Sequence, residues 1–446
     1  MSDVRLTEEA KADIQGFVTS GYGHLAYAAY LLFEIGDRRG VQQWLRSAVP
    51  QVTTAQSWRI DSDLPKSRPQ RALNIAFTAA GLAAIGLSES ALRSFPDEFR
   101  AGIASERRSQ ILGDTGDSAP ETWEVGGPSN PPLHVMFILH AASQGDLDTW
   151  CAAIREAAQG QGMIESPSGP QQGYRPEHDR EPFGFFDAVG QPEILGIKGS
   201  GVQTGEFILG YRNEYGYVPA SPVVPAAEDA SHVLPISENP YRGAAYHDLG
   251  VNGTFVAYRK LQQDVAGFWR FMREESVRQK GEADPRFMVW LAAKMVGRWP
   301  NGVPLVLSPQ PPGSPTIPSN EFEYAQLDPT GLNCPFGSHI RRTNPRDQIR
   351  PAGPAESLHM SLRHRMLRRG RAYGRPLMDP LILDDPEDAA SRQALLDLAH
   401  DGESRGIHFF CVNASIKRQF EFVQQAWMNN PRFNGLVDNR DPISGD

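Results

Sequence analysis

The sequence predicts an α+β protein made of two halves with a similar layout. Segments typical of strands and helices follow one another in a similar order in both halves. The chain of 446 residues is long enough for two ordinary domains. Its 40% apolar and 22% charged residues are typical of a globular protein with a sizeable core. We place the halves at residues 1–200 and 201–446.

The first half is predicted to contain strand, helix, strand, strand and helix, in that order. The apolar, tyrosine-rich run 24–35 predicts a strand, and 41–49 predicts a helix. The segments 72–78 and 134–141 are further apolar runs of strand length. The residues of 146–158 place their apolar side chains on one face of a helix.

The second half repeats this order of elements. The segment 254–261 alternates as a strand does, and 264–278 has apolar residues at helical spacing. A further helix is predicted for 284–297, because a proline stands in its first turn and a glycine at its end. The segment 406–412 predicts a strand, and 415–428 predicts a helix with one apolar face.

Composition excludes several classes of partner. A net charge of −9 argues against nucleic acid, because phosphate binding needs a basic surface. The polar N-terminus and the lack of any apolar run near the roughly 20 residues of a membrane span predict a cytoplasmic protein with no membrane partner. Cys151, Cys334 and Cys411 form no CxxC pair, so we expect neither a disulfide framework nor a zinc ribbon.

The stretch CPFGSHIRRTNPR, 334–346, places three arginines within seven residues of His339. Helix is not expected beyond His339, because Pro345 restricts Asn344. A histidine on a constrained loop can bind a metal while the arginines meet an adjacent anion, and haem combines an iron with two propionates. The alternative is that His339 is an ordinary histidine, one of eleven in the chain.

The stretch RHRMLRRGR, 363–371, holds five arginines in nine positions. Such a run is often a solvated face or a patch for an acidic partner. Here Met366 and Leu367 interrupt the charge and glycines follow, which favours a strand that ends in a turn and points alternate arginines inward. An inward arginine near a metal would be a fixed positive charge.

The stretch GFFDAVGQPEI, 184–194, places one carboxylate, Asp187, in an apolar bend. Gly184 and Gly190 allow backbone conformations that other residues avoid. Phe185 and Phe186 would form a dry wall, with Asp187 as the group there that is able to move a proton.

Phrases spread over nearly the whole chain resemble the dye-decolorizing (DyP-type) haem peroxidases. In family order they are DIQG, NIAFTAAGLAAIGL, FPDEFRAG, ILGDTGDSAPETWE, GRWPNGVPL, CPFGSHIRRTNPRD, MLRRGRAYG and RQFEFVQQAWMNNPRFNG. The resemblance implies two ferredoxin-like halves, each an antiparallel sheet with peripheral helices, and one haem b per chain held mainly by the second half.

The resemblance also implies an activity. Hydrogen peroxide would oxidise dyes and other aromatic or phenolic donors through a ferryl haem intermediate. We expect the activity to be best at acidic pH, because a carboxylate base stays ionised down to about pH 4. Hydrogen peroxide and an aromatic or phenolic reductant are therefore the expected partners, and assembly into a homo-oligomer is left open.

The family's functional residues match five positions of this sequence. The proximal ligand of the haem iron falls on His339, the distal aspartate on Asp187 and the distal arginine on Arg368. Arg346 matches the arginine that meets a haem propionate, and Arg341 is a second, weaker candidate for that role.

Three points stay open beside these assignments. The family's distal loop reads Gly-x-x-Asp-Gly, whereas Ala188 replaces the second glycine here, which puts the aim of Asp187 in question. The acid that orients the proximal histidine is not assigned; Glu421 and Asn413 are in the right region. The arginines at 365, 369 and 371 are interpreted as a solvated face.

Three alternative readings remain. In the first, the chain is a haem-binding or haem-handling protein with weak or no peroxidase turnover. In the second, it is a non-catalytic protein that kept the fold. In the third reading, Cys334 followed by Pro335 supplies a thiolate ligand to haem in place of His339.

Overall fold

A computed structural model describes residues 6–58, 69–187, 189–198, 200–238, 243–312 and 318–445. Within these residues nine strands form one antiparallel sheet, in the order β2-β3-β1-β5-β10-β11-β8, with β4 paired to β1 and β9 paired to β11. A smaller pair consists of β6 (Val223–Pro225) and β7 (Tyr246–Asp248). Ala188 lies outside the described residues.

The strands of the first half surround β1, which is buried along most of its length because nearly all its residues are apolar. Their bounds are β1 (Tyr27–Ile35), β2 (Arg71–Phe77), β3 (Val135–Ala141), β4 (Met163–Glu165) and β5 (Gln171–Tyr174). The helices α3 (Arg38–Ala48) and α8 (Gln144–Gln159) cover one face, where Trp44 and Leu147 pack on Leu31 and Phe33. The predicted strands and helices of this half are confirmed.

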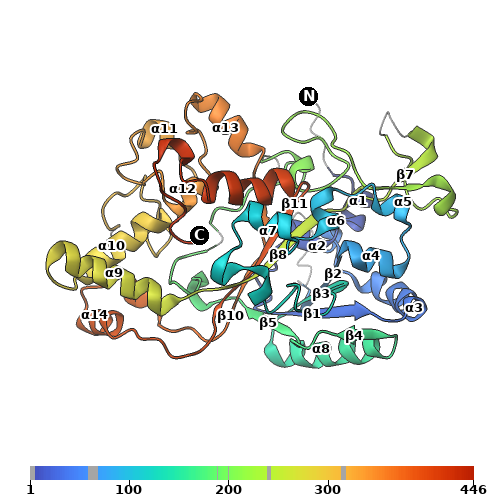
Figure 1. Cartoon of the computed structure of the whole chain (residues 1–446), viewed down its shortest axis with the longest axis horizontal. Helices are drawn as coiled ribbons and strands as arrows, with labels where there is room; N and C mark the ends of the chain where they lie inside the picture. Colours follow the sequence, from blue (N-terminus) through green and yellow to red (C-terminus); the bar gives the residue numbers. More distant parts are fainter. Residues whose placement is uncertain are drawn as a thin grey trace, which may run out of the picture.

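The second half is arranged around a long pair of strands. Its strands are β8 (Phe255–Gln262), β9 (Leu367–Arg368), β10 (Arg371–Tyr373) and β11 (Gly406–Asn413). β11 pairs with β8 from Gly406↔Gln262 to Asn413↔Phe255. The helices α9 (Val265–Lys280), α10 (Pro285–Val296) and α14 (Ala389–Leu396) lie together at one end of the molecule, away from α3 and α8 at the other (Figure 1).

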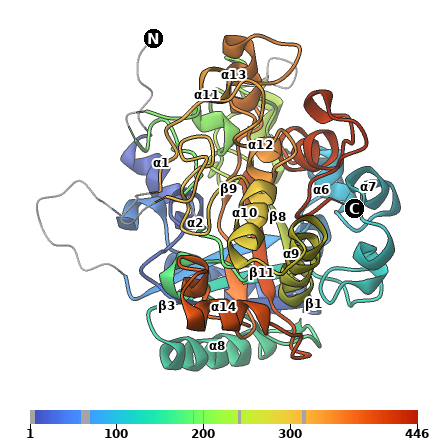
Figure 2. The same ribbon diagram turned by 90° about the vertical axis from the view of Figure 1, so that its left-hand side faces the viewer.

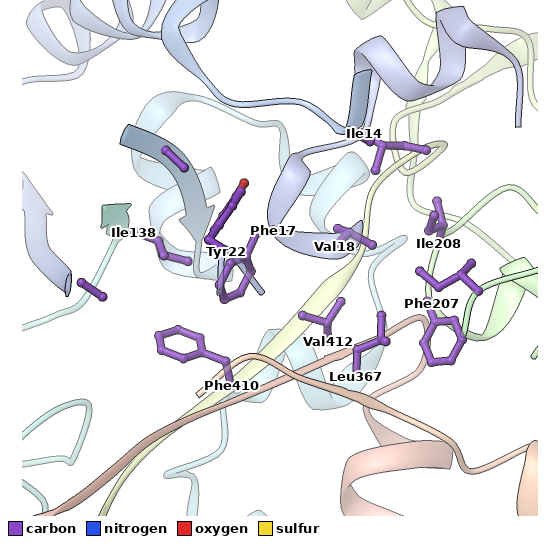
Figure 3. Packing of buried hydrophobic residues seen from close by; sticks show 14 of the residues in the cluster. Ile14, Phe17, Val18, Tyr22, Ile138, Phe207, Ile208, Leu367, Phe410 and Val412 are labelled. Carbon is purple, nitrogen blue, oxygen red and sulfur yellow. The ribbon is translucent and has the colours of Figure 1, made fainter. Parts of the chain in front are cut away.

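The two halves share one sheet. Ala372 of β10 pairs with Tyr174 of β5, so the sheets expected separately in each half are continuous. The α+β class is confirmed. The inner face encloses a core to which distant segments contribute: Phe17 and Tyr22 near the N-terminus, Phe207, and Phe410 of β11 (Figure 3).

The remaining helices are short and lie around the sheet. They are α1 (Glu8–Asp13), α2 (Gly16–Thr19), α4 (Ala79–Ile85), α5 (Glu89–Leu92), α6 (Asp97–Ala101), α7 (Glu106–Leu112), α11 (Tyr324–Leu327), α12 (His339–Thr343) and α13 (Pro354–Leu362). The helix predicted for 415–428 is present as π-helical turns at Lys417–Glu421 and Val423–Met428. Over the described ranges, no helix combines the length and the apolar character needed to cross a membrane.

The expectation that helix ends at His339 is wrong. His339 begins α12, a helix of one turn that runs to Thr343. Pro345 does restrict Asn344, which leaves the helical region with φ −150° and ψ 81°, but the residues before Asn344 are helical. Figure 2 shows α12 directly above α10.

Candidate active site

His339 is oriented by a carboxylate from the end of the chain. Its Nδ1 lies 3.1 Å from Oδ1 and 3.0 Å from Oδ2 of Asp441. The imidazole is 32% exposed whereas the Asp441 side chain is fully buried. Among the described residues Nε2 of His339 makes no hydrogen bond, so it is the nitrogen available to a metal.

The electrostatics of this pair are mutual. Burial lowers the pKa of His339, but the charge of Asp441 and its hydrogen bond raise that pKa more, to above its ordinary value. Burial raises the pKa of Asp441, yet the charge and hydrogen bond of His339, with backbone hydrogen bonds from Ile443 and Ser444, lower it overall. Asp441 is therefore ionised and acts as the acceptor for Nδ1–H.

Arg342 brings the C-terminal segment to His339. It is fully buried and its Nη1 donates to the carbonyl oxygens of Trp427 at 2.8 Å and Asn430 at 3.1 Å. Its Nη2 donates to the carbonyl of Asn439, two residues before Asp441. Arg342, on the same helical turn as His339, thus fixes the C-terminal segment that carries Asp441.

The distal segment, 181–187, crosses from the first half toward the second. Gly184 has φ 100°, and a side chain there would also strike Leu383 at 2.4 Å, so this position requires glycine. The amide of Phe186 donates to Pro300, and the amide of Asp187 donates to Asp179, both at 2.8 Å. Asp187 itself has an exposed side chain.

Arg368 lies next to the continuation of this segment. It stands on β9 opposite Cys411 of β11, and its backbone amide donates to Oε1 of Gln191 at 3.0 Å. A Cβ on Gly190 would lie 3.3 Å from Arg368 Nη2. The positive charge of Arg368 acts on His339 by lowering its pKa. The structure therefore brings Arg368 close to both the distal segment and the imidazole.

Four arginines gather in this region without a carboxylate partner among the described residues: Arg298, Arg346, Arg365 and Arg368. Burial, then the charges of Arg368 and Arg346, lower the pKa of Arg365 to about 9. Burial and the same two charges contribute to a pKa of about 10 for Arg298. Like charges held together in a low-dielectric region are unfavourable unless an anion joins them, so the cluster fits a bound dianion.

Arg346 is held in place inside this cluster. Its Nη1 donates to the carbonyls of Asn320 at 3.0 Å and Phe322 at 2.9 Å, and its guanidinium lies 3.9 Å from the centre of the Phe322 ring. None of these contacts is an ion pair, and burial lowers the pKa of Arg346 against the opposing charges of Tyr324, Glu323 and Asp347. Arg346 is therefore placed to meet an anion.

Arg341 has a different environment. It is fully buried, pairs with Asp328 at 2.9 Å and stacks between Tyr324 and Phe336 at 4.2 and 4.4 Å. It also donates to Gln348. Because its charge is neutralised by Asp328, Arg341 is not placed to meet an anion.

The arginines at 365, 369 and 371 are not a solvated face, so that interpretation is wrong. Arg365 donates to Gly190 at 3.2 Å, Arg369 to Phe17 at 3.0 Å, and Arg371 to Gly21 at 2.8 Å. All three are half-buried, and they tie the residues just before β9, between β9 and β10, and at the start of β10 to the first half.

Cys334 is poorly suited to bind a metal. It is fully buried, and its Sγ lies 3.2 Å from Oγ of Ser338. Burial raises the pKa of its thiol, and a thiol that stays protonated is a weak ligand. The geometry favours His339 over the Cys-Pro alternative.

Sequence reasoning missed Asp441 and two members of the arginine cluster, Arg298 and Arg365. Asp441 stands in a polar segment with no motif around it, and neither Glu421 nor Asn413 takes its place. Glu421 pairs with Arg108 at 2.8 Å, and Asn413 donates to Cys411. No signal in the sequence marks Asp441, because its role depends on a contact between residues 102 positions apart.

The chain is similar in sequence to proteins named as dye-decolorizing peroxidases. A family model described as the DyP dimeric alpha+beta barrel domain matches residues 13–166. A dye-decolorizing peroxidase of Mycena epipterygia is 28% identical over 435 residues, which cover 93% of this chain and 72% of that protein. The multifunctional dye peroxidase DyP2 of Amycolatopsis sp. is 28% identical over 383 residues, covering 84% of this chain and 71% of that protein.

The fold has the same relatives. A crystal structure of a decolorizing peroxidase from Auricularia auricula-judae matches with a TM-score of 0.71 at 23% identity, covering 98% of this chain and 89% of that one. The sequence matches span nearly the whole chain, and the fold match does so as well. The chain is therefore similar, in sequence and in fold, to the DyP-type, or dye-decolorizing, peroxidases.

Proposed function

We propose that this chain is a haem peroxidase that uses hydrogen peroxide to oxidise dyes and other aromatic or phenolic donors. The observation that carries the proposal is His339: its Nδ1 is held by the buried Asp441, while Nε2 is left available in a region of uncompensated arginine charge. This combination suits a group that joins a metal to carboxylates. The relatives named as dye peroxidases support the activity.

The residues present fit one haem b per chain. His339 would bind the iron, and Arg346, with Arg365 and Arg298 beside it, would meet the propionates. Bound haem supplies the redox chemistry, namely two-electron reduction of peroxide followed by one-electron oxidation of a donor. Haem would be held mainly by the second half, 201–446, because His339 and these three arginines all belong to it.

We propose a division of the chain into two ferredoxin-like halves at 1–200 and 201–446. The first half would contribute the distal segment with Asp187. Helices α3 and α8 pack on the first-half strands, and β8 with β11 is followed by helices in the second half, which supports a duplicated layout.

Asp187 and Arg368 would act on hydrogen peroxide. The carboxylate of Asp187 takes the proton from one peroxide oxygen and returns it to the other, which then leaves as water. Arg368 stabilises the negative charge that develops on the leaving oxygen; its guanidinium makes no hydrogen bond to any residue that the structure describes. The carboxylate of Asp441 would accept the hydrogen bond from Nδ1–H of His339 and thereby increase the basicity of Nε2.

Phenolic donors are the substrate class we favour. A related peroxidase, with a TM-score of 0.71 at 23% identity, has been crystallised with 2,6-dimethoxyphenol. That complex supports a phenol as the first donor to assay with this chain.

Haem titration followed by absorption spectroscopy tests the proposal. The wild type should bind one equivalent of haem, and one equivalent of peroxide should shift its absorption bands before 2,6-dimethoxyphenol restores them. His339→Ala should lose the haem spectrum of an imidazole-bound iron, and Asp187→Ala and Arg368→Ala should bind haem but react with peroxide slowly. A wild type that binds no haem, or whose bound haem does not respond to peroxide, contradicts the proposed function.

A further inference from the structure

Glu181 is a second carboxyl group of the distal segment, and the chemistry described above does not use it. Its Oε1 accepts a hydrogen bond from the amide of Phe185 at 2.9 Å, and its Oε2 accepts one from the amide of Phe183 at 3.0 Å. The main chain closes the same turn, since Gly184 N donates to Glu181 O at 2.7 Å. The side chain thus braces the turn from inside.

The brace is anchored in the other half of the protein. Nε2 of Gln263 donates to Oε2 of Glu181 at 2.6 Å, and Gln263 stands between β8 and α9. The amide of Gln263 donates in turn to the carbonyl of Arg405 at 2.8 Å. The turn that precedes Asp187 is therefore fixed by contacts with the second half, which also supplies His339 and Arg368.

Glu181 interacts electrostatically with both Asp187 and His339. Burial, with a smaller contribution from the charge of Asp187, raises its pKa to about 7, against hydrogen bonds from Gln263, Phe185 and Phe183 that lower it. The charge of Glu181 contributes to the raised pKa of His339. Glu181 also lines a cavity of about 330 Å³.

The hydrogen-bond inventory is compatible with a neutral Glu181 as well as an ionised one. Oε1 of Gln263 is buried and has no partner among the described residues. If the amide of Gln263 is reversed, a protonated Glu181 donates to that oxygen and still accepts from Phe185. The brace can therefore hold in both charge states.

We propose that Glu181, held by Gln263, is the positioning residue of the distal segment: it fixes the turn 181–185 and so sets the direction in which Asp187 points. The inference rests on the proposed function, because the direction of the Asp187 carboxylate affects the rate only if Asp187 moves a proton. Residues Phe186 and Asp187 leave this turn directly, so a displacement within it passes to the carboxylate. A shift of about 1 Å at a reacting group costs roughly a hundredfold in rate.

The kinetic test uses Glu181→Ala in the haem-loaded full chain, with the exposed Glu177→Gln as the matched control. The rate constant for reaction with peroxide should fall about tenfold to a hundredfold at unchanged haem content, and Glu177→Gln should match the wild type. In an Asp187→Ala background, Glu181→Ala should change the rate by less than about twofold, because the lost effect acts through Asp187. An undiminished loss in that background, or no loss in the single variant, overturns the proposal.

Amide hydrogen exchange supplies a readout that does not depend on activity. In the full chain, with and without haem, the amides of Phe183 and Phe185 should exchange at least about tenfold faster in Glu181→Ala than in the wild type. Gln263→Leu removes a single bond to Glu181 and should give a smaller change of the same sign, which keeps the test available if Glu181→Ala does not fold. Unchanged exchange in both variants refutes the brace. Since exchange is measured whether or not peroxide reacts, a failure of the brace and a failure of the proposed function give different results.

Discussion

Nδ1 of His339 and Oδ2 of Asp441 lie 3.0 Å apart, although 102 residues separate them in the chain. The contact joins the first residue of α12 to the C-terminal segment. Because the acid is buried and the imidazole is open on its other side, the pair presents Nε2 in a fixed direction.

Asp441→Asn should weaken haem binding. The amide carries no charge, so it stabilises neither the Nδ1–H orientation nor the basicity of Nε2, and second-layer changes of this kind cost about 10- to 100-fold in metal affinity. Haem transfer to an acceptor protein measures the loss. The exposed Asp438→Asn, three residues earlier, is the matched control and should behave as the wild type. Equal haem affinity in both variants would argue against Asp441 as the orienting acid.

Arg365→Met should have opposite effects on the free and the haem-loaded protein. Without haem it removes one of several clustered positive charges, so the melting temperature should stay the same or rise. With haem it removes part of the attraction for the propionates, and affinity should fall about tenfold. Thermal melting with and without haem measures both effects. The exposed Arg392→Met should change neither, whereas a lower melting temperature of the haem-free Arg365→Met would contradict the charge-cluster interpretation.

Arg341→Met should affect stability rather than the haem site. The change leaves Asp328 as a buried, unpaired charge and should reduce the free energy of unfolding by roughly 3 to 5 kcal/mol. The haem affinity of the protein that remains folded should equal that of the wild type. Urea unfolding and haem titration provide the two measurements. Arg346→Met is the contrasting variant: it should lower haem affinity, and a similar loss in Arg341→Met would return Arg341 to the site.

The stability of the haem-free chain should depend on Glu181 between about pH 4.5 and pH 7. Burial raises the pKa of Glu181 from its ordinary 4.5 to about 7, so the folded state binds the proton more tightly than the unfolded state. The folded state is therefore favoured below pH 4.5 and loses that advantage as pH rises through 7, by at most about 3 kcal/mol. Glu181→Gln cannot ionise, so the difference in unfolding free energy between Glu181→Gln and the wild type should grow in favour of the variant over this range. A difference that is constant with pH would show that Glu181 does not titrate there.

Much of the fold followed from local patterns. The runs 24–35 and 134–141 were predictable as strands because apolar residues fill them, and the helix at 284–297 because its proline and glycine mark its ends. The single turn of α12 was not predicted. Pro345 acts at Asn344, and the five residues before Asn344, His339–Thr343, retain enough freedom to complete one turn.

Some features of the candidate site could be predicted from the sequence, and others could not. His339, Arg346 and Arg368 stand in phrases that resemble a known family, and Asp187 matches that family's distal loop except for Ala188, so the sequence by itself was sufficient to propose them. Whether an arginine is neutralised is not a property of its neighbours in the chain. Arg341 and Arg346 are five positions apart, yet Arg341 forms an ion pair with Asp328, whereas Arg346 donates to carbonyl oxygens and lies over the Phe322 ring.

The sequence by itself determined the α+β class, the order of the elements and the residue types able to bind haem, because these depend on periodicity and on short motifs. Only the tertiary structure decided that one sheet joins both halves, that Asp441 orients His339 and that Glu181 braces the turn before Asp187. These are contacts between distant segments. They are fixed by how strands register and how buried charges find partners in space, and no local pattern in the chain records them.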